Sequence, residues 1–156
     1  QTIDCKYEFK ENLTKQRKAS KEAVEPYHYD GTKVTYINFK PSRQGKEVEV
    51  FLFGGMDYRY IINGKAMSED VFVRIYDRDK TQDERHMLMD LKKVNGKSVV
   101  VESSELNQVY KEKTDRKSGL QKIYIDYIIP KVDEEASTSA DPCNRGAMIL
   151  TTGYKY

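Results

Sequence analysis

Apolar and polar residues alternate along much of this chain, most clearly between residues 48 and 77. The side chains of a strand point to its two faces in turn, so this pattern predicts β-structure. In residues 48–53, apolar side chains occupy most of both faces, which predicts a strand covered on both sides. Gly54-Gly55 interrupts the pattern before residues 57–63 resume it. A Gly-rich break between two strands predicts a hairpin.

Further strands follow the same pattern. Asn63-Gly64 predicts a turn because both residues tolerate a positive φ, and residues 70–77 predict a third strand in the same sheet. Asn95-Gly96 is a second turn signal. Other strands are predicted at 33–40, 86–91, 98–102, 105–111, 121–129 and 147–152, and a mobile loop at 131–142. About nine short strands without a repeat favour a β-sandwich, in which a second sheet covers the first.

The first part of the chain has a helical period instead. From about Cys5 to Val24, apolar and small residues recur near helical spacing, and Pro26 follows the predicted helix. The opposite face carries Lys6, Lys10, Lys15, Lys18 and Lys21. A basic amphipathic helix can lie on an anionic membrane or on a partner. The narrow apolar stripe, interrupted by Gln16 and Arg17, favours a helix packed at the edge of the sandwich with its lysines in water.

The run EVEVFLFGGMDYRYIINGK, continued by SEDVFVRIYDRDK, resembles the bacterial pre-peptidase C-terminal domain family. Members show a strand, a Gly-containing turn before an aromatic strand, and a hydrophobic strand that ends in Tyr-Asp. Ser118-Gly119-Leu120 followed by residues 121–129 is a looser likeness. The resemblance implies a jelly-roll-like β-sandwich in an exported, non-catalytic module. It also implies a periplasmic, cell-surface or secreted location, with a signal peptide removed before Gln1.

The length and composition of the chain limit the classes of protein to which it can belong. A chain of 156 residues fits one domain, 1–156, with a core of its own. Its 27 Lys and Arg residues nearly balance 25 Asp and Glu residues, whereas a nucleic-acid binder carries a clustered basic excess. No stretch approaches the ~20 apolar residues of a membrane span. We therefore expect no nucleic-acid partner and no membrane-spanning segment.

The cysteines and acidic residues are candidates for covalent or metal chemistry. Cys5 and Cys143 are candidates for a disulfide in an oxidising compartment, and two unpaired buried thiols are the alternative. A catalytic thiol needs a histidine, and neither His28 nor His86 lies near a cysteine in the sequence. No cofactor is expected. Calcium is the one candidate ion, with possible oxygen ligands in Asp77, Asp79, and Asp83 or Glu84, although the spacing is not that of an EF-hand loop.

The sequence contains no nucleophile elbow, P-loop, zinc-protease or dinucleotide-binding motif, so no catalytic residue is predicted. Asp126, on the polar face of a strong strand, is expected to pair with a lysine across the sheet. Tyrosine is abundant, with twelve residues, and most lie in predicted strands. The exceptions flank His28 or lie near the end of the sequence. The candidate binding residues are therefore Tyr27, His28, Tyr29, Tyr154 and Tyr156.

Three functions are compatible with these features. The leading hypothesis is a non-catalytic exported module that binds a protein or a cell-envelope polymer. The second is a carbohydrate-binding module that uses its exposed tyrosines as a platform. The third is a hydrolase that depends on two carboxylates, which a cleft with two facing carboxylates would favour.

Overall fold

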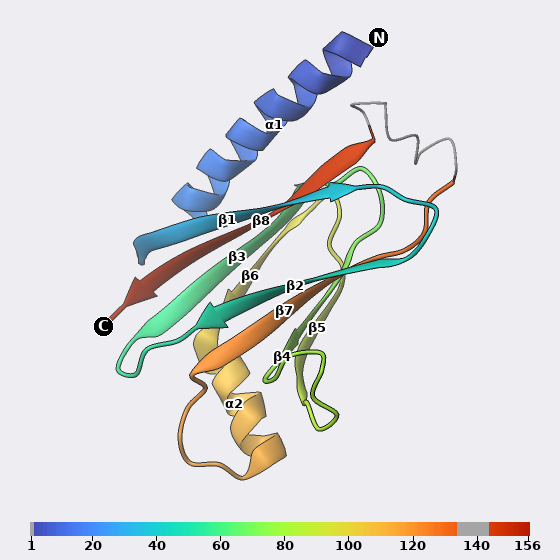
Figure 1. Ribbon diagram of the computed structural model, residues 1–156. Helices are drawn as coiled ribbons and strands as arrows, with labels where there is room; N and C mark the ends of the chain where they lie inside the picture. Colours follow the sequence, from blue (N-terminus) through green and yellow to red (C-terminus); the bar gives the residue numbers. More distant parts are fainter. Residues whose placement is uncertain (1, 134–143) are drawn as a thin grey trace.

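The computed structural model describes residues 2–133 and 144–156. Two four-stranded antiparallel sheets face each other, with one helix beside the first sheet and another at one end (Figure 1). Sheet A has the order β1-β8-β3-β6, and sheet B has the order β2-β7-β4-β5. The elements are α1 (Thr2–Ala23), β1 (His28–Asn38), β2 (Gln44–Phe51), β3 (Asp57–Ala66), β4 (Phe72–Tyr76), β5 (Met87–Lys93), β6 (Ser98–Glu102), α2 (Ser103–Thr114), β7 (Lys122–Ile129) and β8 (Arg145–Lys155).

The strand pairs are nested. β1 pairs with β8, β2 with β7, β3 with β6 and β4 with β5, all antiparallel. This is the pairing of one long hairpin rolled up so that successive strand pairs lie in opposite sheets, which is the jelly-roll arrangement. The predicted antiparallel β-sandwich of jelly-roll type, with an N-terminal helix, is confirmed.

The hairpin predicted around Gly54-Gly55 is wrong. The strand before these glycines, β2, lies in sheet B, and the strand after them, β3, lies in sheet A. β4 returns to sheet B, so the three successive strands do not form one sheet. Gly55, with a φ of +84°, lies in a connection that crosses between the sheets. Alternation shows which side chains share a face, but it does not show which strand lies alongside.

Residues 48–53 are covered on one side only, which corrects a second prediction. Val48 and Leu52 are buried between the sheets, as expected. The two phenylalanines of the other set are open to solvent, with Phe51 53% and Phe53 69% exposed. β2 is an edge strand of sheet B, so less of the protein surrounds it than surrounds a central strand.

Asn63-Gly64 is not a turn but lies within β3. The backbone of Gly64 meets the β5–β6 connection: its N–H donates to the carbonyl of Lys97, and its carbonyl accepts from the N–H of Gly96, both at 2.8 Å. A Cβ on Gly64 would lie 2.4 Å from the carbonyl oxygen of Val94. The glycine permits this close approach. The turn predicted at Asn95-Gly96 is present, and Gly96 has a φ of +79°.

Residues 105–111 are helical, so the strand predicted there is wrong. Leu106 is fully buried, and Val109 and Tyr110 pack against the same core at the three- and four-residue spacing of a helix. Glu102 and Glu105 form a capping box at the start of α2. The apolar pattern of so short a segment fits both the two-residue period of a strand and the 3.6-residue period of a helix. Here the capping box and the contacts with the core favour the helix.

α1 packs across the outer face of sheet A. Its Leu13 joins Ala66, Ala147 and Ile149 in a small second core, with Phe9 and Val34 beside it. These contacts fall on β3 and β8, the central strands of the sheet, so the predicted position at an edge is wrong. The five lysines are exposed, as expected. Within residues 2–133 and 144–156, no helix is long and apolar enough to cross a membrane.

The main core lies between the sheets. β7 contributes the face predicted for it, with Ile123, Ile125, Tyr127 and Ile129 fully buried. The rings of Tyr58 and Tyr60 stack with centroids 6.2 Å apart on the facing sheet. Burial raises the pKa of the Tyr60 and Tyr127 hydroxyls well above the usual value, because their charged forms would be desolvated.

Candidate binding surfaces

Three of the five predicted binding residues meet at one end of the sandwich. The β1–β8 register places His28 directly opposite Tyr154, and their ring centroids are 5.4 Å apart. Tyr156 continues the group, with its ring 5.9 Å from that of Tyr154. The end of β8 thus joins a segment that lies more than a hundred residues earlier in the sequence.

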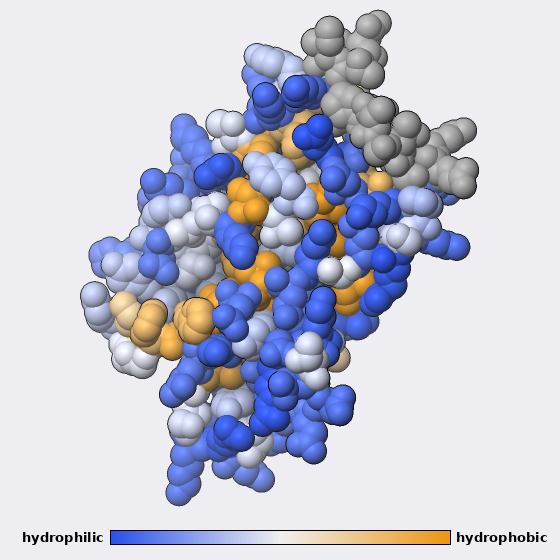
Figure 2. Space-filling view, viewed as in Figure 1, coloured by the Kyte–Doolittle hydropathy of each residue, from blue (hydrophilic) through white to orange (hydrophobic). Residues whose placement is uncertain are grey.

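A fourth aromatic ring, Phe53, belongs to the same end. The β2–β3 connection that carries it lies beside the C-terminus in Figure 1. Its N–H donates to Tyr58 Oη at 3.0 Å, and Tyr58 is the register partner of Tyr154 on β3. Figure 2 shows apolar surface at this corner of a molecule that is otherwise mainly hydrophilic on the face in view. We call His28, Phe53, Tyr154 and Tyr156 the aromatic end.

The other two predicted residues, Tyr27 and Tyr29, lie on the α1 side of sheet A, and cations contact their rings. Arg59 lies 4.3 Å and Lys155 4.8 Å from the ring centroid of Tyr27. Lys21 lies 4.6 Å from that of Tyr29. The Tyr27 hydroxyl also donates to Glu102 at 3.1 Å. These cation–π contacts occupy surfaces that a ligand would need for stacking.

The rings of the aromatic end are not coplanar. His28 and Tyr154 are inclined at 42°, and Tyr154 and Tyr156 meet edge to face at 84°. A flat sugar stacks best on a flat platform, whereas rings in different planes fit an irregular partner. The arrangement favours contact with a protein or a polymer over stacking against a single sugar.

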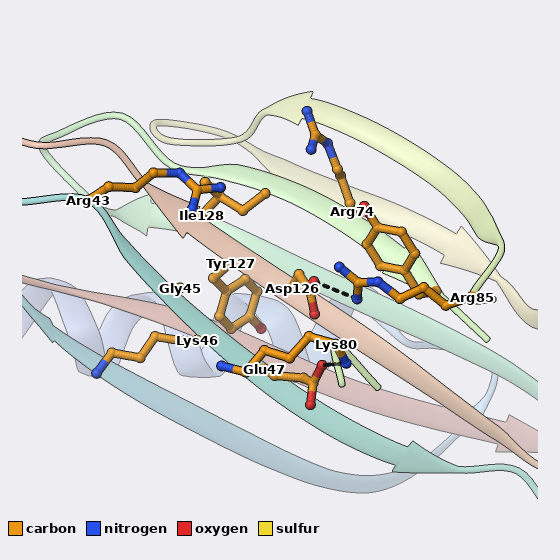
Figure 3. A pocket seen from close by; sticks show the side chains of 11 residues that line it. Arg43, Gly45, Lys46, Glu47, Arg74, Lys80, Arg85, Asp126, Tyr127 and Ile128 are labelled. Atoms are coloured by element: carbon orange, nitrogen blue, oxygen red, sulfur yellow. Dashed lines mark hydrogen bonds and ion pairs between the residues drawn. The ribbon is translucent and has the colours of Figure 1, made fainter. Parts of the chain in front are cut away.

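A second surface lies on the outer face of sheet B, and the sequence predicted only one of its residues. It is a pocket of about 300 Å³ over β2, β7 and β4, bordered by the β4–β5 loop (Figure 3). We call it the sheet B pocket. Its lining consists of Arg43, Gly45, Lys46, Glu47, Arg74, Tyr76, Lys80, Arg85, Asp126, Tyr127 and Ile128.

Asp126 lies at the centre of the sheet B pocket. The register places Glu47 on one side of it and Arg74 on the other, so the three form a row across β2, β7 and β4. Its carboxylate Oδ2 accepts from Arg85 Nη1 at 3.0 Å, as drawn in Figure 3. The partner of Asp126 is therefore a loop arginine rather than the cross-strand lysine expected. The sequence did not predict this pair, because Arg85 is distant from Asp126 in the sequence and lies in a charged segment without a strand or helix pattern.

The calcium candidates do not come together. Asp77 accepts hydrogen bonds from the backbone N–H of His86 and, at 3.0 Å, contacts the His86 ring. Asp79 accepts from the backbone N–H and the hydroxyl of Thr81, and these hydrogen bonds lower its pKa. Among residues 2–133 and 144–156, no three His, Cys, Asp or Glu side chains form a group that could hold a metal ion, Asp83 and Glu84 included.

Cys5 lies on α1 and is disulfide-bonded. Cys143, its predicted partner, lies outside the described residues, so the pairing of these two cysteines stays a prediction.

No family model matches this chain, and neither does any curated protein. Among solved structures, it is similar to a chain in the structure of infectious bursal disease virus Gx strain, with 13% sequence identity and a TM-score of 0.25. The match covers 81% of this chain but only 32% of the viral one. A TM-score this low carries no argument about fold or function. The class of the protein, a jelly-roll β-sandwich, rests on the order of the eight strands in residues 2–133 and 144–156.

Proposed function

We propose that this chain is a non-catalytic, exported jelly-roll module that binds a protein or a cell-envelope polymer through its aromatic end. The observation that supports binding there is the β1–β8 register, which joins His28 to Tyr154 and Tyr156 on one surface. The exported location rests on the resemblance of residues 47–80 to the pre-peptidase C-terminal domain family.

The exposure of this surface supports the proposal. Phe53 is 69% and Tyr156 86% exposed, and both carry large rings whose burial against a partner is favourable. Aromatic side chains dominate binding energy because they bury much area and have few torsions to restrict. Because the rings lie in different planes, they fit a partner with an uneven surface, such as a folded protein or a branched polymer.

The test is binding of the oxidised 156-residue chain to purified peptidoglycan sacculi and to bacterial envelope fractions with and without protease treatment. Binding that protease abolishes indicates a protein partner, and binding to sacculi indicates a polymer. Phe53→Ala and Tyr156→Ala are each expected to weaken binding about tenfold, as for a moderate interface contact. Failure to bind any of these preparations contradicts the proposal.

Tyr7→Ala is the matched control. Tyr7 is 62% exposed and lies on α1, away from the aromatic end, so its removal takes away a similar exposed ring. It should leave binding unchanged. If neutral glycans bind with an affinity that depends on Tyr154 and Tyr156, the alternative of a carbohydrate-binding tyrosine platform is correct.

A carboxylate-dependent hydrolase is the second candidate, favoured by one observation. Glu47 and Asp126 are cross-strand partners in the sheet B pocket, so two carboxylates share one site. We place it second because each carboxylate already accepts from a neighbouring N–H group: Glu47 from the backbone of Lys80 at 2.8 Å, and Asp126 from Arg85. Release of reducing ends from a glycan panel, abolished by Glu47→Gln, would establish the hydrolase.

A further inference from the structure

Three residues that line the sheet B pocket have a buried side-chain atom without a hydrogen-bond partner: Asp126 (Oδ1), Arg74 (Nε) and Tyr127 (Oη). Arg74 Nε lies 3.9 Å from the carboxylate of Asp90, its partner on β5, so its charge is paired. Tyr127 belongs to the core face of β7, which leaves Asp126 Oδ1 as the unpaired atom on the pocket side. Asp126 is only 8% exposed, so its second oxygen cannot be satisfied by open solvent in the way a surface carboxylate is. A buried acceptor left unpaired is costly, and a ligand that donates to it recovers that cost.

The charges around these two atoms are uneven. Arg43, Arg74, Lys80 and Arg85 bring four positive charges to the pocket, against the two carboxylates of Glu47 and Asp126. Lys46 also borders the pocket, but its register partner is the buried Tyr127, so it belongs to the other face of the sheet. Two of the four cations are engaged. Arg85 pairs with Asp126 and lies 3.6 Å from the Tyr76 ring centroid, and Arg74 pairs with Asp90 at 3.9 Å.

Two of the cations remain available. Neither Arg43 nor Lys80 has a carboxylate within ion-pair distance among the residues that the structure describes. Figure 3 shows Arg43 near Ile128 and Lys80 beside Glu47. A ligand in this pocket therefore meets unpaired positive charge from Arg43 and Lys80 and one unpaired acceptor, Asp126 Oδ1.

This combination disfavours several simple ligands. A sulfate ion pairs with the cations but has no proton to donate to Asp126 Oδ1, whereas a hydrogenphosphate or dihydrogenphosphate ion has one or two such protons. A neutral sugar satisfies Asp126 and leaves the positive charge without a partner, and a cationic ligand is repelled. A hydroxyl group can donate to Asp126 Oδ1, and a carboxylate on the same molecule pairs with a guanidinium.

We propose that the sheet B pocket binds an acidic saccharide unit, a sugar ring that carries a carboxylate together with free hydroxyl groups. An acidic peptide offers similar groups but fits less well. The pocket lies over β7, inside the sheet, whereas the strand edges that pair with a peptide backbone belong to β2 and β5. A volume of about 300 Å³ is at the lower end for ligand sites and suits one unit of a chain.

Gly45 makes a direct test possible. It lies on β2 opposite Ile128, on the same face as Glu47, and a Cβ built on it meets no atom within 4 Å. Gly45→Val therefore fills space in the pocket without a clash and places a β-branched residue in a strand, where such residues are favoured. The variant changes no charge, so a loss of binding reports the loss of the space itself.

The experiment is calorimetric titration of the oxidised 156-residue chain with trigalacturonic acid, the matching neutral galactose trisaccharide and an acidic peptide. We expect the uronic acid to bind, the neutral sugar to bind at least about tenfold more weakly, and added salt to reduce the affinity. Gly45→Val should abolish binding, and Arg43→Gln should weaken it roughly tenfold. Arg17→Gln, which removes an exposed arginine from α1, should change nothing.

Four outcomes overturn the proposal: no binding of the uronic acid, equal binding of the two sugars, wild-type affinity in Gly45→Val, or binding of the peptide alone. Arg43 is exposed, so its variant remains informative if Gly45→Val fails to fold. Phe53→Ala at the aromatic end should leave uronic-acid binding intact, which keeps this site and the proposed function separately testable.

Discussion

Asn63 on β3 donates from its side-chain Nδ2 to Ser20 Oγ on α1 at 2.9 Å. The same amide reaches Gln16 Oε1 at 3.1 Å, while Asn63 Oδ1 accepts from the N–H of Lys65 at 2.9 Å. All three side chains of this contact between helix and sheet are buried. The face of α1 that packs on sheet A is therefore apolar except for this buried hydrogen-bonded group. Gln16, which interrupts the apolar pattern in the sequence, belongs to this group.

Asn63→Ala is expected to lower the free energy of unfolding by about 1–3 kcal/mol, because it leaves the buried Oε1 of Gln16 and Oγ of Ser20 without the amide group that donates to them. Urea denaturation followed by circular dichroism measures the change. Asn38→Ala, at the exposed end of β1, is the matched control and should have little effect. Equal losses in the two variants would show that the buried contact does not stabilise the fold.

Gly64→Ala should cost roughly 1–3 kcal/mol of stability, because the added methyl group would lie 2.4 Å from the carbonyl oxygen of Val94. Gly54→Ala tests the same chemical change in open space, where a Cβ meets nothing within 4 Å. Thermal unfolding of both variants checks the difference. A Gly64→Ala protein as stable as Gly54→Ala would contradict the close approach of β3 to the β5–β6 connection.

Tyr124 should ionise at unusually high pH. Its hydroxyl donates to Glu49 Oε2 at 2.7 Å, and this bond, with burial and the carboxylate charge, raises the pKa of Tyr124 to about 12 from 10.0. Between these two values the unfolded state loses its proton first, so this contribution to stability is present below pH 10 and is lost as pH rises.

Tyrosine titration by NMR measures this pKa. Glu49→Gln removes the carboxylate and should return the pKa of Tyr124 toward 10. An unchanged high value in the variant would assign the shift to burial alone.

Cys5 and Cys143 are predicted to form a disulfide, and peptide mapping without reduction should recover their two peptides joined. A Cys5→Ser variant is expected to lose about 2–5 kcal/mol of stability, since the bond closes a long loop of the unfolded chain. Reducing agent should lower the melting temperature of the wild-type protein and leave that of the variant unchanged. Recovery of Cys143 as a free thiol in the oxidised protein would refute the pairing.

Local pattern was sufficient to predict the strands and the first helix. Alternation identified the buried face of β7, with Ile123, Ile125, Tyr127 and Ile129, because a strand's side chains alternate regardless of its neighbours. Of the nine strands predicted from the sequence, eight are strands in the structure, and the one at 105–111 is a helix. The aromatic residues near His28 and Tyr154 were singled out because they lie outside the predicted strands, although the structure places His28, Tyr29 and Tyr154 within β1 and β8.

Only the tertiary fold decides which strands pair and which side chains contact one another. The nested pairing separates β2 from β3, turns Gly64 into a point of backbone contact, and leaves Phe53 at an open end. It also brings Arg85 to Asp126 and lines Glu47, Asp126 and Arg74 up in one row. Strand periodicity states which way a side chain points. Which side chains it meets depends on long-range pairing and on packing between the sheets, and that information is spread over the whole chain.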